Sequence, residues 1–159
     1  MQDSEKVLKY KVYKSINELN DGDKKLVEKA MKATENSYAP YSNFQVGACI
    51  ELENGELFTG CNQENAVYPL SLCAERVTVF FANAQFPDIA VKTIAVAAQT
   101  KGNFTKSPVP PCGSCRQVLA EVEGRYNKPM KVLLYGDDEI YELDSASSLL
   151  PVTFNKKFL

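Results

Sequence analysis

The spacing of hydrophobic and polar residues changes several times along the chain, and each change predicts a different element. Apolar residues recur at helical intervals in residues 21–37, with acidic residues at the start that suit the helix dipole. Phe44–Leu52 alternates in part, and Asn54-Gly55 separates it from a second short run, residues 56–61. Because Asn-Gly between two such runs favours a tight turn, we predict a helix followed by a β-hairpin.

The rest of the chain alternates between helical and strand patterns. The predicted elements are a helix apolar on nearly every side at 70–84, a buried strand at 92–98, a helix at 113–123 closed by Gly124, and strands at Lys131–Tyr135 and Ile140–Leu143. A hairpin followed by crossover helices implies a mixed sheet with helices on its faces. We therefore predict an α/β protein, a three-layer α/β/α sandwich with a mixed sheet of about five strands, formed by a single domain over residues 1–159.

Composition and charge restrict the possible partners. The 159 residues carry a net charge of −2 without a basic stripe, whereas nucleic-acid binders usually show a concentrated positive surface. No stretch approaches the roughly 20 apolar residues of a membrane span, and the N-terminus lacks the apolar run of a signal peptide. We therefore expect a cytoplasmic protein that binds a small molecule and has neither a nucleic acid nor a membrane as its partner.

The chain has five cysteines and no histidine. An odd number of cysteines cannot all pair, so without an export signal we expect thiols that are free or bound to metal. The lack of histidine excludes Ser-His-Asp and Cys-His catalysis. A zinc site must then use thiolates and carboxylates, and a base that works near neutral pH must be a carboxylate, Lys, Tyr or Cys.

Three cysteines lie where the predicted helices begin: Cys73 in Cys-Ala-Glu-Arg, and Cys112 and Cys115 in Pro-Cys-Gly-Ser-Cys. At a helix start, the dipole and the free N–H groups favour thiolate over thiol. If the two helix starts face each other, three thiolates can bind zinc and leave its fourth position for water, which is the pattern of catalytic zinc sites.

Glu75 and Arg76, which follow Cys73 closely in the sequence, add to this hypothesis. In the first turn of a helix, the side chain of Glu75 can still curl toward the metal, where it could carry protons. Three thiolates give the centre a net negative charge, which weakens the ability of zinc to acidify water. Arg76 shares a helix face with Cys73, so it can hydrogen-bond the sulfurs and offset that charge.

Four segments together carry a resemblance to a known family: residues 39–47 (APYSNFQVG), 60–80 (GCNQENAVYPLSLCAERVTVF), 111–119 (PCGSCRQVL) and 149–154 (LLPVTF). The chain resembles the homotetrameric cytidine deaminase family over residues 38–154. A glutamate that is not a ligand and a Pro-Cys-x-x-Cys element are part of the zinc deaminase pattern.

The resemblance implies hydrolytic deamination of cytidine and 2′-deoxycytidine to uridine and 2′-deoxyuridine, with release of ammonia, in pyrimidine salvage. One Zn2+ per subunit would be bound by Cys73, Cys112 and Cys115. Zinc-bound hydroxide would attack C4 of the base, and Glu75 would move protons to N3 and then to the leaving amine.

The resemblance also implies the substrate contacts. Phe44 would stack on the pyrimidine, and the backbone N–H of Ala74 would contact the base oxygen O2. Asn62 and Glu64 would hydrogen-bond the 3′-hydroxyl of the ribose.

Further contacts would come from neighbouring subunits of a homotetramer, through Ala66, Tyr68 and Phe154. The chain departs from the family pattern at Pro69, where the family often has glycine. It also has an N-terminal extension, residues 1–20, for which the family suggests no role.

Simpler interpretations stay open. Cys112 and Cys115 could be a thioredoxin-like redox pair, and Cys61 or Cys49 could close a structural zinc site as a fourth ligand. Cys49, within an apolar run, is best explained as a small core residue. The alternatives for activity are a deaminase of another cytosine-bearing small molecule, such as blasticidin S, and a non-catalytic zinc-binding module.

Overall fold

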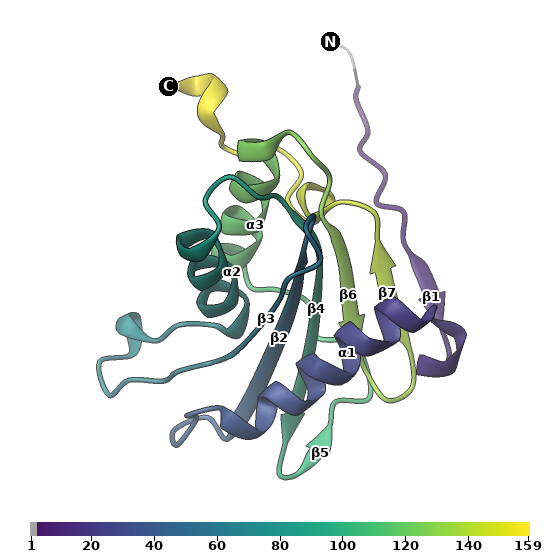
Figure 1. The fold of residues 1–159 in the computed structure, drawn as a ribbon, viewed down its shortest axis with the longest axis vertical. Helices are drawn as coiled ribbons and strands as arrows, with labels where there is room; N and C mark the ends of the chain where they lie inside the picture. Colours follow the sequence, from purple (N-terminus) through teal and green to yellow (C-terminus); the bar gives the residue numbers. More distant parts are fainter. Residues whose placement is uncertain (1–2) are drawn as a thin grey trace.

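The computed structural model describes residues 3–159 and contains one mixed sheet of seven strands (Figure 1). The strands are β1 (Lys11–Tyr13), β2 (Phe44–Leu52), β3 (Leu57–Cys61), β4 (Val91–Thr100), β5 (Asn103–Phe104), β6 (Lys131–Tyr135) and β7 (Ile140–Leu143). Their order across the sheet is β1-β7-β6-β4-β2-β3, and β5 pairs with β4. The helices are α1 (Asp21–Ala33), α2 (Ala74–Gln85) and α3 (Gly113–Tyr126), with short 3-10 turns at Ile16–Glu18, Thr34–Asn36, Tyr68–Leu70, Ala146–Leu149 and Lys156–Phe158.

The side chains of the central strands alternate between two cores. Ala48 and Ile50 of β2 pack in the core that α2 and α3 cover, whereas Cys49 between them packs with α1 on the opposite face. Figure 1 accordingly shows α1 crossing one face of the sheet, with α2 and α3 on the other. The alternation arises because successive strand residues point to opposite faces. The predicted three-layer α/β/α sandwich with a mixed sheet is confirmed.

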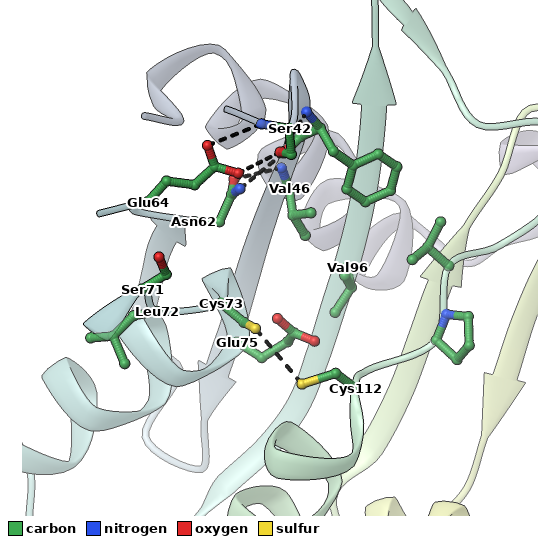
Figure 2. A pocket seen from close by; sticks show the side chains of 13 residues that line it. Ser42, Val46, Asn62, Glu64, Ser71, Leu72, Cys73, Glu75, Val96 and Cys112 are labelled. Atoms are coloured by element: carbon green, nitrogen blue, oxygen red, sulfur yellow. Dashed lines mark hydrogen bonds between the residues drawn. The ribbon is translucent and has the colours of Figure 1, made fainter. Parts of the chain in front are cut away.

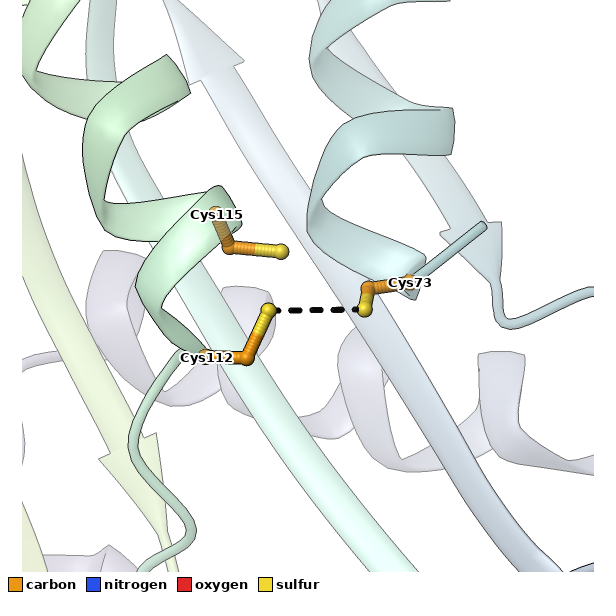
Figure 3. A group of neighbouring side chains, drawn as sticks. All are labelled: Cys73, Cys112 and Cys115. Atoms are coloured by element: carbon orange, nitrogen blue, oxygen red, sulfur yellow. Dashed lines mark hydrogen bonds between the residues drawn. The ribbon is translucent and has the colours of Figure 1, made fainter. Parts of the chain in front are cut away.

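The strand directions explain where the two helices of one face begin. Only the pairing of β4 with β6 is parallel among the described strands, and α3 lies in the connection between them. A parallel pair needs such a crossover, because the chain must return to the same end of the sheet. The connection through α2 leads from β3 to β4, and the N-termini of α2 and α3 lie side by side (Figure 3).

The sheet has two more strands than the five predicted. β5 has two residues, and β1 has three residues from the N-terminal extension, where Lys11 pairs with Glu142 of β7. Both are too short to show an alternating pattern, which is why the sequence did not reveal them. The second helix begins at Ala74 instead of residue 70, because Cys73 is extended (φ −72°, ψ 152°) and Tyr68–Leu70 forms a separate 3-10 turn.

The first helix is fixed by a cap and by a close contact with the sheet. The side chain of Asn20 accepts a hydrogen bond from the backbone N–H of Asp23 at 3.0 Å, which caps the start of α1. α1 then lies directly on β2, where a Cβ added at Gly47 would be 2.1 Å from the carbonyl oxygen of Ala30. Of the helices in residues 3–159, none is long and apolar enough to cross a membrane.

Candidate active site

The starts of α2 and α3 bring the three predicted thiols together. Cys73 is the N-cap of α2, Cys112 is the N-cap of α3, and Cys115 lies in the first turn of α3 (Figure 3). Their Sγ atoms all lie within 4.8 Å of one another, and those of Cys73 and Cys112 are 3.7 Å apart. Tetrahedral zinc with Zn–S bonds of about 2.3 Å places two sulfurs about 3.8 Å apart. The donor set and its spacing therefore fit zinc.

The surroundings of the thiols favour negative charge at Cys73. A hydrogen bond from the Cys115 thiol and hydrogen bonding from the Arg76 guanidinium lower the pKa of Cys73 to about 5, against the effect of burial. The same hydrogen bond raises the pKa of Cys115, because that thiol is the donor. Neither helix start has a side-chain cap, so first-turn N–H groups remain free to stabilise thiolates.

The other two cysteines lie apart from this group. Among residues 3–159, the group of possible metal ligands contains Cys73, Cys112 and Cys115 and includes neither Cys49 nor Cys61. Cys49 is fully buried in the core beneath α1, and burial raises its pKa to about 11. The sulfur of Cys61 accepts a hydrogen bond from Gln63 Nε2 at 3.2 Å. The arrangement supplies three thiols, as a catalytic zinc site requires, and not the four of a closed structural site.

Glu75, the second residue of α2, lies beside the thiols. Its side chain is buried, with 4% of the residue exposed, yet it lines the same cavity as Cys73 and Cys112 (Figure 2). Burial raises the pKa of Glu75, and the negative charge of Cys73 adds to that effect. A carboxyl group with a raised pKa can both accept and donate a proton near neutral pH. The burial and the raised pKa of Glu75 are compatible with its predicted role as a proton carrier.

Arg76, in the first turn of α2, contacts the sulfur of Cys73. Its Nη2 donates to Cys73 Sγ at 3.7 Å and to the backbone carbonyl of Ser71 at 3.5 Å. The thiolate in turn raises the pKa of the guanidinium. The predicted contact between Arg76 and a ligand sulfur is present.

A cavity of about 300 Å³ opens above the thiols (Figure 2). This volume is at the lower end of the range for small-molecule sites. The cavity is lined by Ser42, Phe44, Val46, Asn62, Glu64, Ser71, Leu72, Cys73, Glu75, Val96, Val109, Pro110 and Cys112. Three of the predicted substrate residues, Phe44, Asn62 and Glu64, therefore lie in one cavity with Glu75.

Asn62 and Glu64 lie at the end of the cavity away from the thiols (Figure 2). Asn62 Nδ2 donates to the carbonyl of Phe44 at 2.9 Å, and Asn62 Oδ1 accepts from the N–H of Val46 at 2.8 Å. The carboxylate of Glu64 accepts hydrogen bonds from the loop at Tyr41 and Ser42, which lower its pKa. An anionic acceptor and an amide with a further N–H to donate suit a sugar hydroxyl.

The other predicted substrate residues do not line this cavity. Ala74 is fully buried at the start of α2, whereas Ala66 and Tyr68 are exposed in the segment before α2. Phe154 is 60% exposed and stacks on Phe158, with ring centroids 5.7 Å apart. The resemblance assigns Ala66, Tyr68 and Phe154 to sites in neighbouring subunits, and that assignment stays a prediction.

Several cavity residues were not singled out from the sequence. Ser42, Ser71 and Leu72 line the cavity, and so do Val109 and Pro110, which precede Cys112 in the chain. Ser42 lies inside a segment that matches the family, residues 39–47, and this was the only signal available for it.

A known protein family matches most of the chain. Residues 20–127 match the model of the cytidine and deoxycytidylate deaminase zinc-binding region. The chain belongs to this family. Since the matched region is one that binds zinc, the cofactor of this deaminase is zinc. The cluster of three thiols from Cys73, Cys112 and Cys115 fits a zinc ion.

Relatives of this deaminase match it over most of their length. It is 42% identical to the cytidine deaminase of Sporosarcina psychrophila over 135 residues, which cover 85% of this chain and 93% of the relative. It is 44% identical to the cytidine deaminase of Halalkalibacterium halodurans over 129 residues, 81% of this chain and 91% of the relative. The crystal structure of cytidine deaminase from Burkholderia pseudomallei is similar with a TM-score of 0.71 and 39% identity, over 86% of this chain and 100% of that chain.

Proposed function

We propose that this protein is a zinc-dependent cytidine deaminase, which converts cytidine and 2′-deoxycytidine to uridine and 2′-deoxyuridine. The observation that carries the proposal is the group of three thiols within 4.8 Å of one another, two of which, Cys73 and Cys112, line one cavity of about 300 Å³ together with the buried Glu75. When bound by the three thiolates, zinc supplies a Lewis acid that makes water a nucleophile near neutral pH. The overall reaction consumes one water, adds its oxygen at C4 and releases the amino group as ammonia.

Glu75 moves the protons of this reaction. Its carboxylate takes a proton from the attacking water and passes it to N3 of the base, so that C4 becomes tetrahedral. It then takes the remaining hydroxyl proton and delivers it to the amine, which leaves as ammonia when the C4–N bond breaks. The raised pKa of Glu75 supports this role, because the group must be a base in one step and an acid in the next.

The remaining cavity residues orient the nucleoside. The thiols and Glu75 lie at the base end, and Asn62 and Glu64 lie at the other end, where they would bind the 3′-hydroxyl of the sugar (Figure 2). Phe44 would stack on the pyrimidine between the two ends, and the N–H of Ala74 would contact O2. The separation of the two ends favours a substrate that carries both a base and a sugar.

We further propose a homotetramer in which Ala66, Tyr68 and Phe154 complete the sites of neighbouring subunits. Large apolar side chains support it, because they are exposed in the single chain: Tyr38, Tyr41, Val67, Tyr68, Leu70, Leu72, Phe80, Phe81 and Phe154. Apolar surfaces of this kind commonly mark contacts between proteins.

We also propose that residues 1–159 form one domain and that the protein acts in the cytoplasm. The five free thiols suit that compartment.

An assay with purified protein tests the function. Wild-type protein should convert cytidine and 2′-deoxycytidine with one zinc per chain, as followed by ultraviolet absorbance and metal analysis. Glu75→Gln should keep its zinc and lose about 10² to 10⁴ in rate, the usual contribution of general acid–base catalysis. Glu121→Gln is the matched control, because Glu121 is exposed on α3 away from the cavity, and it should be fully active.

Two results would contradict the proposal at different levels. Wild-type protein that holds one zinc per chain and converts neither nucleoside would refute the function. Turnover by Glu75→Gln within a few-fold of wild type would leave the function intact and refute the role of Glu75.

A further inference from the structure

We infer that Ser42 is a positioning residue that sets Glu64 and Phe44 for the nucleoside, so that its hydroxyl determines how strongly the enzyme uses the 3′-hydroxyl of its substrate. This inference rests on the proposed function, because it assigns Glu64 to the sugar and Phe44 to the base. Ser42 lines the cavity but lies at the end away from the thiols, so its effect is separable from zinc binding (Figure 2).

The first part of the argument is the set of bonds to Glu64. Ser42 Oγ donates to Glu64 Oε1, and the backbone N–H of Ser42 lies 3.3 Å from Glu64 Oε2. The N–H of Tyr41 donates to the same Oε2 at 2.9 Å. The hydroxyl of Ser42 is therefore the one side-chain group within the described residues that holds Oε1, while backbone groups hold Oε2. Without it, the carboxylate could rotate and Oε1 would lose its fixed direction.

The second part is the bond to Phe44. The N–H of Phe44 donates to Ser42 Oγ at 3.0 Å, and the carbonyl of Phe44 accepts from Asn62 Nδ2 at 2.9 Å. One hydroxyl thus accepts from the backbone of the base-stacking residue and donates to the sugar-binding carboxylate. A serine hydroxyl has both capacities, whereas alanine has neither.

The local backbone explains how Ser42 can serve both partners. Asn43, between Ser42 and Phe44, has a positive φ of 54°, and its N–H donates to the carbonyl of Ala39 at 3.0 Å. This tight turn directs the N–H groups of Tyr41 and Ser42 toward Glu64 and returns the chain to β2 at Phe44. Ser42 is exposed, so its side chain is not needed to fill the core.

The test compares two substrates that differ only in the 3′-hydroxyl, 2′-deoxycytidine and 2′,3′-dideoxycytidine. For Ser42→Ala, kcat/KM for 2′-deoxycytidine should fall about ten-fold, the usual effect of losing one hydrogen bond to a charged group. The fall should appear mainly in KM, because Glu75 and the thiols are untouched. For 2′,3′-dideoxycytidine, kcat/KM should change less than three-fold, since this substrate cannot use Glu64.

Three variants complete the design. Ser42→Thr keeps the hydroxyl and should restore kcat/KM for 2′-deoxycytidine to within about three-fold of wild type. Thr100→Ala is the matched control, because Thr100 Oγ1 donates to the carbonyl of Asn43 at 3.1 Å in the same loop without touching Glu64; it should leave the ratio between the two substrates unchanged. If Ser42→Ala does not fold, Ser42→Cys gives the same comparison with a weak donor of similar size.

The outcomes separate the inference from the function on which it rests. Equal losses on both substrates in Ser42→Ala, or unchanged kinetics on both, would overturn the inference that Ser42 determines the use of the 3′-hydroxyl, while the deaminase activity of wild type stands. A wild-type protein that converts neither nucleoside would refute the proposed function itself. Zinc content and the unfolding temperature of each variant, measured on the same samples, exclude a general loss of structure.

Discussion

At the scale of single residues, three ionisable thiols lie together at one point of the molecule. Three thiols within 4.8 Å of one another would repel each other strongly as thiolates without a cation between them. The structure offers first-turn N–H groups and Arg76 as partial compensation, and zinc supplies the rest. The three thiols therefore form one ligand group, in which the loss of any member affects the others.

Single replacements of Cys73, Cys112 or Cys115 by Ala should each lower zinc content well below one per chain. They should also lower the unfolding temperature, because the free energy of metal binding is coupled to folding. Metal analysis and thermal unfolding of the purified variants check both. Cys61→Ala removes a thiol outside the group and should keep its zinc. Stoichiometric zinc that survives dialysis in all three variants would show that the ligands lie elsewhere.

The sequence predicted well which three thiols lie together and predicted poorly which residues surround them. Cysteines at helix starts have a local signature, since the helix pattern begins directly after Cys73 and Cys112. The place of Ser42 depends on the positive φ of Asn43 and on a partner, Glu64, that lies 22 residues further along the chain. No local pattern reveals such a pairing, because it arises only when the loop and β3 meet.

At the scale of elements, β1 gives the N-terminal extension a structural role. Glu142 of β7 is buried, and its carboxylate accepts hydrogen bonds from Lys11 Nζ at 2.6 Å and from Tyr13 OH at 2.8 Å. Burial alone would raise the pKa of Glu142, but these partners outweigh burial and leave the pKa lowered. The extension thus stabilises a charge that the rest of the sheet buries.

Removal of residues 1–14 should lower the unfolding temperature by about 5 °C at neutral pH, as expected for the loss of hydrogen bonds to a buried charge. Because the pKa of Glu142 is lowered in the full chain, its stabilisation is present above the ordinary glutamate value of 4.5 and is lost as the pH falls below it. The difference between full and shortened chains should therefore shrink in acid. Thermal unfolding between pH 3.5 and 7.5 measures it.

Two further variants test the cause of this effect. Glu142→Gln in the shortened chain should recover part of the lost stability, because a neutral amide needs no cation. Lys14→Ala in the full chain removes an exposed pair with Glu139 and should change little. A shortened chain as stable as the full one at neutral pH would contradict the role of β1.

Strands with a recognisable run of apolar residues were predictable from the sequence, whereas very short strands were not. The ranges of β2, β6 and β7 agree with the predicted runs, because each is long enough, or apolar enough, to be read locally. β1 exists because β7 offers an edge and Glu142 offers a partner, and neither can be inferred from three residues. The start of α2 shifted for a similar reason, since Leu72 pairs with Gln63 in an isolated bridge before the helix begins.

At the scale of the whole molecule, large aromatic side chains stay exposed in the single chain. Phe154 stacks on Phe158 and is 60% exposed, although the family resemblance places it over the pyrimidine of a neighbour. Burial of such a ring against another subunit contributes roughly 1.5–3 kcal/mol. An assembly that closes the cavity in this way would also exclude water from the substrate.

A mixture of two inactive variants tests this arrangement. Phe154→Ala and Glu75→Gln should each be nearly inactive alone, whereas co-expressed chains should recover part of the activity. A mixed tetramer can combine an intact Glu75 of one chain with an intact Phe154 of another. Activity assays on the co-expressed protein and sedimentation of wild type measure the two requirements. A fully active wild-type monomer at assay concentration would contradict the shared site.

The short N-terminal strand has a consequence for aggregation. A sheet edge offers unpaired N–H and C=O groups to any other extended chain, and long apolar edges are therefore prone to fibre formation. Here one of the two outer edges is β1, which has only three residues and carries Lys11, with Lys14 just after it, both exposed to solvent. An incoming strand would find few backbone groups to pair with and would bring its own side chains against charged, solvated ones. The extension thus ends the sheet with a strand that is a poor template for further strands.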